Sequence, residues 1–336
     1  MGHPAIQMPG RMPGPLGEAA PSEASVRPAS QLEQAGIAIS LLVVSVFTTL
    51  STGAVLMFNF RHGDPPFAAN AGFFPLAWAW FHPDQIAGGW PFALTLLAIL
   101  GAHEAGHYFA CRYHGVRSSL PWILPAPTLI GTFGAFIRLR SRVPSRTALM
   151  DIGVSGPLAG IVVTLPILIL GLLLSHPVAP AGFHSAASIS VSVPLGLSVL
   201  HNILRLFDPS LPPLDGAFNP HPILVAAWIG LFITSVNLIP AGQLDGGHIL
   251  YALSPRLHRW ITSAVIFLLF FAGTMLWVGW LVWGCFLLPS LRHPSVPPVP
   301  MRLGRRAWLA AIALALLVLT ITPEPFAGGS LMNLLH

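Results

Sequence analysis

The sequence predicts an all-α polytopic membrane protein, with about seven transmembrane helices and one membrane-embedded segment that is not a regular helix. Of its 336 residues, 54% are hydrophobic and only 8% are charged, whereas soluble domains carry about a quarter charged residues. The apolar residues form runs of the ~20 residues that cross a bilayer core about 30 Å thick. The basic residues, all of them arginine, cluster at the ends of these runs.

Six apolar runs carry the expected spans. They are residues 36–60, 88–111, 148–174, 222–244, 260–288 and 306–321. The run 260–288 is too long for one untilted span, and Gly273 and Gly279 near its middle favour a tight hairpin of two short spans. Splitting this run gives the total of about seven.

The arginines test this map. With the N-terminus inside, the arginines that follow spans two, four and six all lie inside, and only Arg61 and Arg205 lie outside. The inside set is Arg112, Arg117, Arg138, Arg140, Arg142, Arg146, Arg256, Arg259, Arg292, Arg302, Arg305 and Arg306. Because these side chains mark span ends instead of one solvated face interleaved with aromatics, the pattern argues against nucleic-acid binding.

Two segments depart from regular spans. Residues 1–35 are rich in Pro, Ala, Gly and Ser and predict a disordered cytoplasmic tail, so that residues 36–336 form one polytopic domain with its core at about 88–251. Residues 120–136 are apolar but contain three prolines and two glycines. A regular lipid-facing helix is excluded there, and we expect a re-entrant loop or a short β-hairpin buried in the protein.

The second span contains the pattern His103-Glu104-Ala105-Gly106-His107. Residues four apart share a helix face, so His103 and His107 can direct two imidazoles at one metal ion. Glu104 can then take a proton from water and return it to a leaving amine. Polar residues at membrane depth need a compensating partner, and zinc supplies one. A polar helix that packs against other helices and binds nothing is the alternative interpretation.

A catalytic zinc needs a third protein ligand, for which Asp245 is the best candidate. It lies in the segment Asn237-Leu238-Ile239-Pro240-Ala241-Gly242-Gln243-Leu244-Asp245-Gly246-Gly247-His248, whose proline and glycines interrupt the helix. A helix-capping aspartate at the membrane surface is the alternative for Asp245. We expect His248 to reach toward the interface and not toward the metal. Asp151, before the apolar part of span three, is expected to begin a helix and to pair with a nearby arginine.

These motifs, together with the sequence of residues 103–146 and of Asp151 to Gly160, resemble the site-2 protease family of intramembrane metalloproteases. The similarity extends from about Leu97 to the last span. The resemblance is to the branch with the plastid proteases linked to ethylene-dependent gravitropism and their bacterial relatives. It implies that His103, His107 and Asp245 bind zinc and that Glu104 is the catalytic base. It also implies that Asn237 orients the substrate carbonyl or stabilises the oxyanion, although an interhelical hydrogen bond is an equal alternative.

The resemblance further implies roles for two segments. The small residues Ser155 to Gly160 permit close approach of a neighbouring helix or of an extended substrate. The segment 131–136 corresponds to a membrane-embedded strand region that could pair with an unwound substrate.

The sequence thus predicts an intramembrane zinc metalloprotease that hydrolyses peptide bonds within or near the transmembrane segments of membrane proteins. Its partners are a transmembrane protein substrate and membrane lipid, and no oligomeric state is predicted. The alternative is a non-proteolytic membrane metal transporter or metal-binding protein with the same ligands. The alanine-rich, arginine-only composition predicts a multi-pass protein of the bacterial inner membrane, with its active site toward the cytoplasm.

Overall fold

The computed structural model describes residues 31–68, 75–177, 191–211, 213–214, 218–298, 302–326 and 329–332. Its elements are α1 (Gln31–His62), α2 (Pro75–Phe81), η2 (Pro83–Gly89), α3 (Trp90–Tyr113), β1 (Trp122–Pro125), β2 (Thr132–Phe136), α4 (Arg146–Leu173), β3 (His176–Pro177), α5 (Leu195–Phe207), β4 (Phe218–Asn219), α6 (Pro222–Leu238), α7 (Asp245–Leu253), α8 (Pro255–Met275), α9 (Gly279–Leu287), η3 (Leu288–Ser290) and α10 (Leu303–Thr320). The described part is therefore mostly helical.

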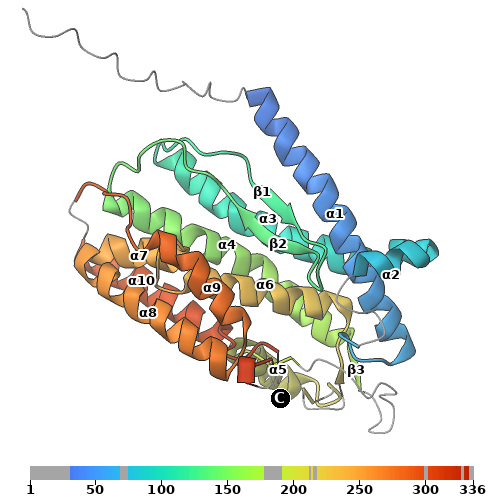
Figure 1. The fold of residues 1–336 in the computed structure, drawn as a ribbon. Helices are drawn as coiled ribbons and strands as arrows, with labels where there is room; N and C mark the ends of the chain where they lie inside the picture. Colours follow the sequence, from blue (N-terminus) through green and yellow to red (C-terminus); the bar gives the residue numbers. More distant parts are fainter. Residues whose placement is uncertain are drawn as a thin grey trace, which may run out of the picture.

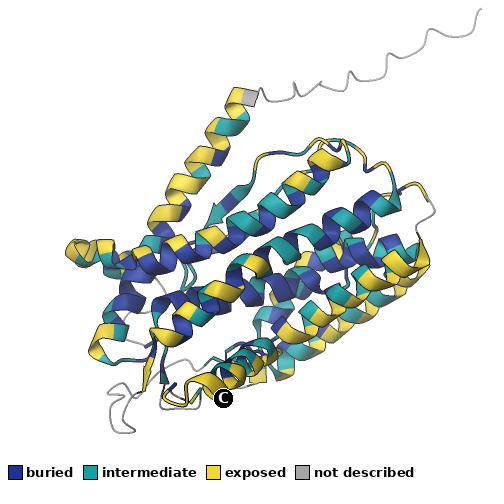
Figure 2. Cartoon of the chain, turned by 180° about the vertical axis from the view of Figure 1, so that it is seen from behind, coloured by how far each residue is buried: buried dark blue, intermediate teal, exposed yellow. Residues whose placement is uncertain are grey.

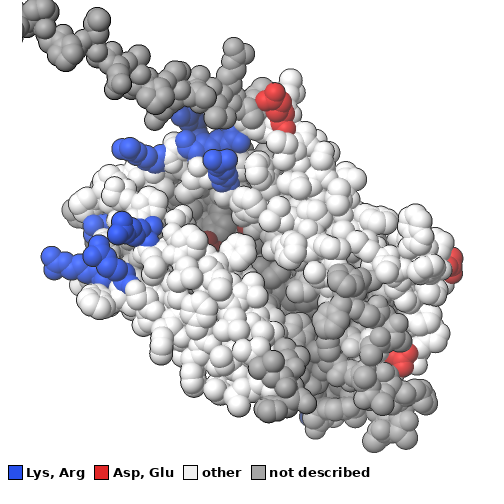
Figure 3. Space-filling model, in the orientation of Figure 1, with Lys and Arg blue, Asp and Glu red and all other residues white. Residues whose placement is uncertain are grey.

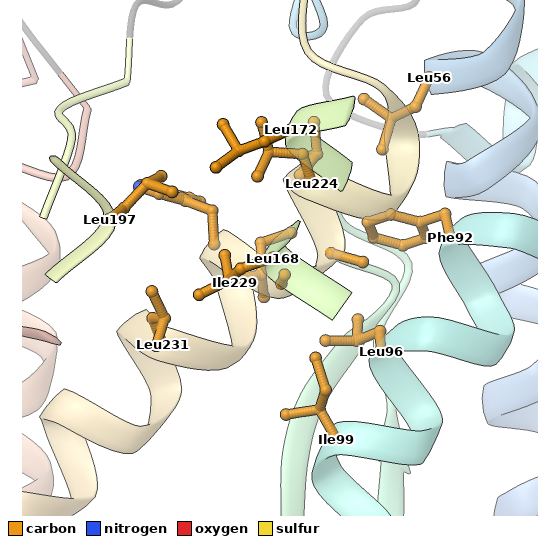
Figure 4. Close-up of a cluster of buried hydrophobic side chains, with 14 of the residues drawn as sticks. Leu56, Phe92, Leu96, Ile99, Leu168, Leu172, Leu197, Leu224, Ile229 and Leu231 are labelled. Atoms are coloured by element: carbon orange, nitrogen blue, oxygen red, sulfur yellow. The ribbon is translucent and has the colours of Figure 1, made fainter. Parts of the chain in front are cut away.

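The centre of the molecule is formed by α3, α4 and α6, which pack against one another (Figure 1). Helix α6 is apolar on all sides, and nearly every residue of it is buried, as a helix without a polar face must be. Leucines and isoleucines of α4 and α6 interlock with Phe92, Leu96 and Ile99 of α3 (Figure 4). This cluster fixes α3 against its two neighbours.

Five helices in the described residues are long and apolar enough to cross a membrane. They extend over Leu32–His62, Pro83–Tyr113 (η2 with α3), Arg146–Leu173, Pro255–Met275 and Leu303–Thr320. The outer helices expose large apolar side chains, such as Phe267 and Phe271 of α8 and Leu314 of α10, while the central helices are buried (Figure 2). So much exposed apolar surface is typical of a protein that sits in lipid. The chain is thus a helical polytopic membrane protein.

The run 260–288 is split, as its glycines predict. Helices α8 and α9 pack side by side after a break at residues 276–278. Gly273 makes the packing close, because a Cβ there would overlap Leu281.

The fourth run ends earlier than predicted. Helix α6 stops at Leu238, and residues 239–244 form an irregular turn before α7 begins at Asp245. The prediction of a span to residue 244 was wrong because Pro240 cannot continue the helix and Gly242 adopts a φ of 58°. The early stop leaves room for α7 to fold back against the end of α6.

Residues 120–136 form a β-hairpin, one of the two structures predicted for them. Strands β1 and β2 are antiparallel, with Ile123 opposite Ala135 and Leu124 opposite Gly134. The hairpin lies between α1 and α3 (Figure 1). Gly131 at its turn has a φ of 79°, and a Cβ there would lie 2.8 Å from Thr49 Cα. Only glycine combines this φ with this approach to α1.

Buried hydroxyls of α1 hold the hairpin. Ser45 Oγ donates to the Ile123 carbonyl at 3.0 Å, Thr48 Oγ1 to the Gly131 carbonyl at 2.6 Å, and Thr52 Oγ1 to the Thr128 carbonyl at 3.3 Å. These bonds satisfy hairpin carbonyls that face the helix, which matters where no water is present. The polar stripe within the first span therefore attaches the hairpin to it.

The periphery agrees with the sequence in part. Helix α10 matches the last run to within a few residues, while α5 lies between the third and fourth runs. Helix α1 begins at Gln31, so the last residues of the expected tail are helical. The rest of the tail, residues 1–30, lies outside the described residues.

The Thr48 contact gives a testable expectation. Thr48→Val removes the donor to the Gly131 carbonyl and should lower stability by about 1 kcal/mol, with faster hydrogen exchange at the hairpin amides. Thermal unfolding in detergent measures the change in stability, and mass spectrometry measures the hydrogen exchange of the hairpin amides.

The neighbouring Thr49→Val is the matched control, since the Thr49 hydroxyl donates at 2.6 Å to the Ser45 carbonyl of its own helix. Equal exchange rates in the two variants would contradict a specific role of Thr48 in holding the hairpin.

Candidate metal centre

Three polar side chains from distant parts of the sequence meet inside the helical core. Nε2 of His103 and Nε2 of His107 lie 3.1 Å apart. Oδ2 of Asp245 lies 3.1 Å from the first nitrogen and 3.2 Å from the second. Both histidines are buried and Asp245 is nearly so. Two imidazoles and one carboxylate that converge in this way form a candidate metal site.

Local sequence explains how each side chain reaches the site. His103 and His107 are one turn apart on α3 and share its inner face. Asp245 is the first residue of α7. Gly246 and Gly247 follow it where a Cβ would overlap backbone carbonyls of the turn after α6. The two glycines thus let the start of α7 press against the end of α6, which carries Asp245 to the histidines.

Helix α8 fixes the same turn from the other side. The ring nitrogen Nε2 of His258 lies 2.9 Å from the Gly242 carbonyl, and the Gly242 amide donates to Thr262 Oγ1 at 3.2 Å. Both side chains are fully buried. A turn held at both its amide and its carbonyl positions Asp245 with little freedom.

The ring orientation of His107 is set by the backbone. Nδ1 of His107 lies 2.8 Å from the Ile152 carbonyl of α4. A carbonyl only accepts, so the proton is on Nδ1 and Nε2 keeps its lone pair. This is the tautomer a metal ligand requires. Nδ1 of His103 is buried without a hydrogen-bond partner in the described structure.

A cavity of about 200 Å³ opens beside these residues. Glu104 lines it and is buried, and Ile137, directly after β2, lines the same cavity. Asn237 lines it too, with Nδ2 3.4 Å from Nε2 of His103. Figure 3 shows a hollow with acidic atoms at its base and arginines gathered above it and to its left. The arrangement places a carboxylate, a side-chain amide and the candidate metal site around one space.

Comparison with known proteins decides the family. Residues 91–278, more than half of the chain, match peptidase family M50.

The chain belongs to peptidase family M50.

Plant proteins are among the relatives of this M50 chain. It is 33% identical over 241 residues to the rice (Oryza sativa subsp. japonica) protein named probable zinc metalloprotease EGY1, chloroplastic, covering 69% of this chain and 40% of the relative. It is 32% identical over 243 residues to the Arabidopsis thaliana protein of the same name, covering 69% and 42%. The Arabidopsis thaliana protein named probable zinc metalloprotease EGY2, chloroplastic, is 30% identical over 253 residues, covering 73% and 43%. The chain spans about two fifths of the length of these relatives.

These relatives overturn the prediction of a bacterial inner membrane. They are named as chloroplastic, so they point to a plastid membrane. The prediction was wrong because arginine-only, alanine-rich composition reports no compartment: apolar spans with inside arginines meet the requirements of either bilayer.

The small-residue motif of this M50 chain serves the metal centre directly. A Cβ on Gly156 would overlap the His107 ring, and one on Gly106 would overlap the Ser155 carbonyl. Gly160, one turn further along α4, faces His103, and a Cβ there would lie 3.4 Å from its Nδ1. The motif therefore lets the helix α3 approach α4 closely, one of the two roles that the resemblance implied.

Sequence reasoning missed several supports of the centre. Neither the Ile152 carbonyl nor the side chains of His258 and Thr262 were predicted from the sequence to support the site. Asp151 lies in the second turn of α4, and not at its start, and pairs with Arg305 at 2.7 Å and with His114 Nε2 at 2.9 Å. The pairing with an arginine was predicted, while the histidine partner was not.

The close approach at Gly156 leads to a prediction. Gly156→Ala should displace the His107 ring and reduce metal affinity at least about tenfold, as loss of ligand orientation does. Isothermal titration with zinc, or metal content after dialysis, measures the change.

Gly160→Ala is the matched comparison on the same helix, because its Cβ would make only ordinary contact with His103. Gly101→Ala on α3, where a Cβ meets open space, controls for the substitution itself. An affinity unchanged in Gly156→Ala would show that the ring does not depend on this glycine.

Proposed function

We propose that the chain is a zinc endopeptidase that cleaves peptide bonds within or next to transmembrane segments of other proteins. The observation that carries the proposal is the convergence of His103, His107 and Asp245 beside Glu104 in one cavity of a membrane helix bundle. The names of the relatives, zinc metalloproteases, support the same reading.

The donor set supports zinc. Ligands at about 2.0–2.1 Å in a tetrahedral zinc site are separated by roughly 3.3 Å. The three donor atoms here lie 3.1–3.2 Å apart. Nitrogen and carboxylate donors suit this metal, and three protein ligands leave one position open, as in hydrolytic sites. His103, His107 and Asp245 would hold the ion.

When bound, zinc would supply Lewis acidity that lowers the pKa of an attacking water toward 7. The carboxylate of Glu104 would accept the proton of that water and deliver it to the leaving amine nitrogen. Its burial keeps bulk water from competing for that proton. The side-chain amide of Asn237, 3.4 Å from Nε2 of His103, would donate to the developing oxyanion of the substrate carbonyl.

We propose seven spans for the membrane-spanning domain, residues 36–336, with its core at about 88–251. To the five long helices, α8 among them, this adds α6, enclosed by α3 and α4, and α9, the second arm of the α8–α9 hairpin. The hairpin returns the chain to the side of Arg256 and Arg259, where Arg292 follows. The cavity then opens toward the arginine-rich side, and the β1–β2 hairpin lies at membrane depth.

A substrate for this site must be an unwound segment, because a helix keeps its carbonyls in internal hydrogen bonds. Residues Ala135, Phe136 and Ile137 at the end of β2 form one wall of the cavity. A strand at that wall offers backbone groups for strand addition. Transmembrane proteins with a locally unstable helix, presented in lipid, are therefore the proposed substrate class.

A metal transporter with the same ligands is the second candidate. It requires further ligands along a path through the bilayer. Within the described residues, His103, His107 and Asp245 form one group of possible metal ligands, and no second group of three or more lies along such a path. Glu104, placed beside these residues, has no task in a transporter, so the protease is favoured.

The base supplies the direct test. Glu104→Ala should keep one equivalent of zinc and lose cleavage of a model transmembrane peptide by at least about a hundredfold. Metal analysis and a cleavage assay on the purified protein in detergent measure the two properties. Retained cleavage with the base absent would rule out this mechanism.

Asn237→Ala separates the two roles of the amide. As an oxyanion donor it should lower kcat by about 10²–10³-fold with unchanged zinc content. A loss of thermal stability with unchanged kcat would instead assign Asn237 to an interhelical hydrogen bond.

A further inference from the structure

A second histidine pair borders the cavity and has no part in the candidate metal site. His248 lies one turn after Asp245 on α7 and lines the cavity. Its Nδ1 is 2.8 Å from Nε2 of His293, which follows η3. His248 is absent from the group of ligand atoms that lie within 4.8 Å of one another. The expectation that it reaches away from the metal agrees with this, but its ring forms part of the cavity wall.

Hydrogen bonds determine which nitrogen of His248 carries its proton. Nδ1 of His293 lies 2.7 Å from the Pro294 carbonyl, which only accepts, so this nitrogen is protonated. Nε2 of a neutral His293 ring is then an acceptor. It takes its hydrogen bond from Nδ1 of His248, which leaves Nε2 of His248 with a free lone pair.

The free nitrogen is available to a ligand. Nε2 of His248 forms no hydrogen bond with the described residues, and it is not among the buried polar atoms that lack a partner. Since the other ring nitrogen is engaged and the side chain lines the cavity, we infer that Nε2 of His248 accepts a hydrogen bond from a ligand N–H in that cavity.

We propose that this ligand group is a backbone N–H of the extended peptide substrate, an inference that rests on the proposed protease function. An extended strand presents N–H and C=O groups in alternation. The side-chain amide of Asn237 can donate a hydrogen bond to a carbonyl of this strand, while the unprotonated Nε2 of His248 can accept one from a backbone N–H of the strand. His248 thereby acts as a substrate-positioning residue beside the reacting bond.

His293 acts through His248. Its ring stacks on Tyr251 at a centroid distance of 4.0 Å and is anchored to the Pro294 carbonyl. Both contacts hold the ring so that its Nε2 meets Nδ1 of His248. The segment after the α8–α9 hairpin thus contacts the cavity-lining His248 through His293, and removing that ring would leave the His248 tautomer unfixed.

The test uses peptides in which one backbone N–H near the cleaved bond is replaced by an ester oxygen. Binding of each ester peptide and of the all-amide peptide is measured on zinc-loaded protein carrying Glu104→Gln, so that no cleavage intervenes. At one position the ester should bind about three- to tenfold more weakly, as loss of one hydrogen bond implies. In Glu104→Gln with His248→Phe, the ester and amide peptides should bind equally at that position.

Matched variants separate this role from a structural one. His293→Gln keeps an acceptor for Nδ1 of His248 and should retain the discrimination, whereas His293→Phe should reduce it. His62→Phe makes the same change at an exposed position on α1 and should leave the discrimination intact. Zinc content should match in all of these proteins.

Discrimination that is unaffected by His248→Phe at every ester position overturns the inference. So does a loss of discrimination that accompanies loss of zinc, because that would indicate a structural role. The proposed protease function is tested separately, by measuring cleavage of the all-amide peptide with protein in which Glu104 is intact.

Discussion

The contact of Asp245 with His103 and His107 is the interaction on which the rest of the structure depends. An ionised carboxylate inside an apolar bundle costs several kcal/mol unless partners compensate it. The imidazoles, and a metal ion that these three side chains could hold, offset that cost only if all three groups meet within about 3 Å. The packing of α3, α4, α6 and α7 satisfies this geometric demand.

Close packing of α3 against α4 provides part of the geometry that this contact requires. In a lipid environment, apolar helices gain little from leaving one apolar phase for another, so small residues and tight contact drive their association. Gly106 and Gly156 bring α3 and α4 together and leave just enough room for the His107 ring. The same approach places the Ile152 carbonyl on that ring. Packing and ring orientation are therefore set by one contact between two helices.

The β-hairpin brings irregular backbone to the other side of the cavity. Strand backbone that is buried away from water needs a partner for every polar group. The hairpin meets part of this need through its own ladder and part through the hydroxyls of Ser45, Thr48 and Thr52 on α1. Helix α1 lies outside the match to the family, yet it supports the wall that ends at Ile137, beside Glu104. An apparently generic first span thus has a specific part in the site.

Sequence by itself determined the helical membrane class, the approximate extent of the long helices and the identity of the residues that meet. These follow from local properties: apolar run length, the four-residue spacing of His103 and His107, and the helix-breaking Pro240 and Gly242. The choice of hairpin over loop and the supports from Ile152, His258 and Gly156 were decided only by the tertiary structure. Each depends on which backbone group or side chain lies opposite in space, between residues tens of positions apart, and no spacing along one chain records that. His248 shows the limit most clearly, because its role follows from a proton on His293, 45 residues away.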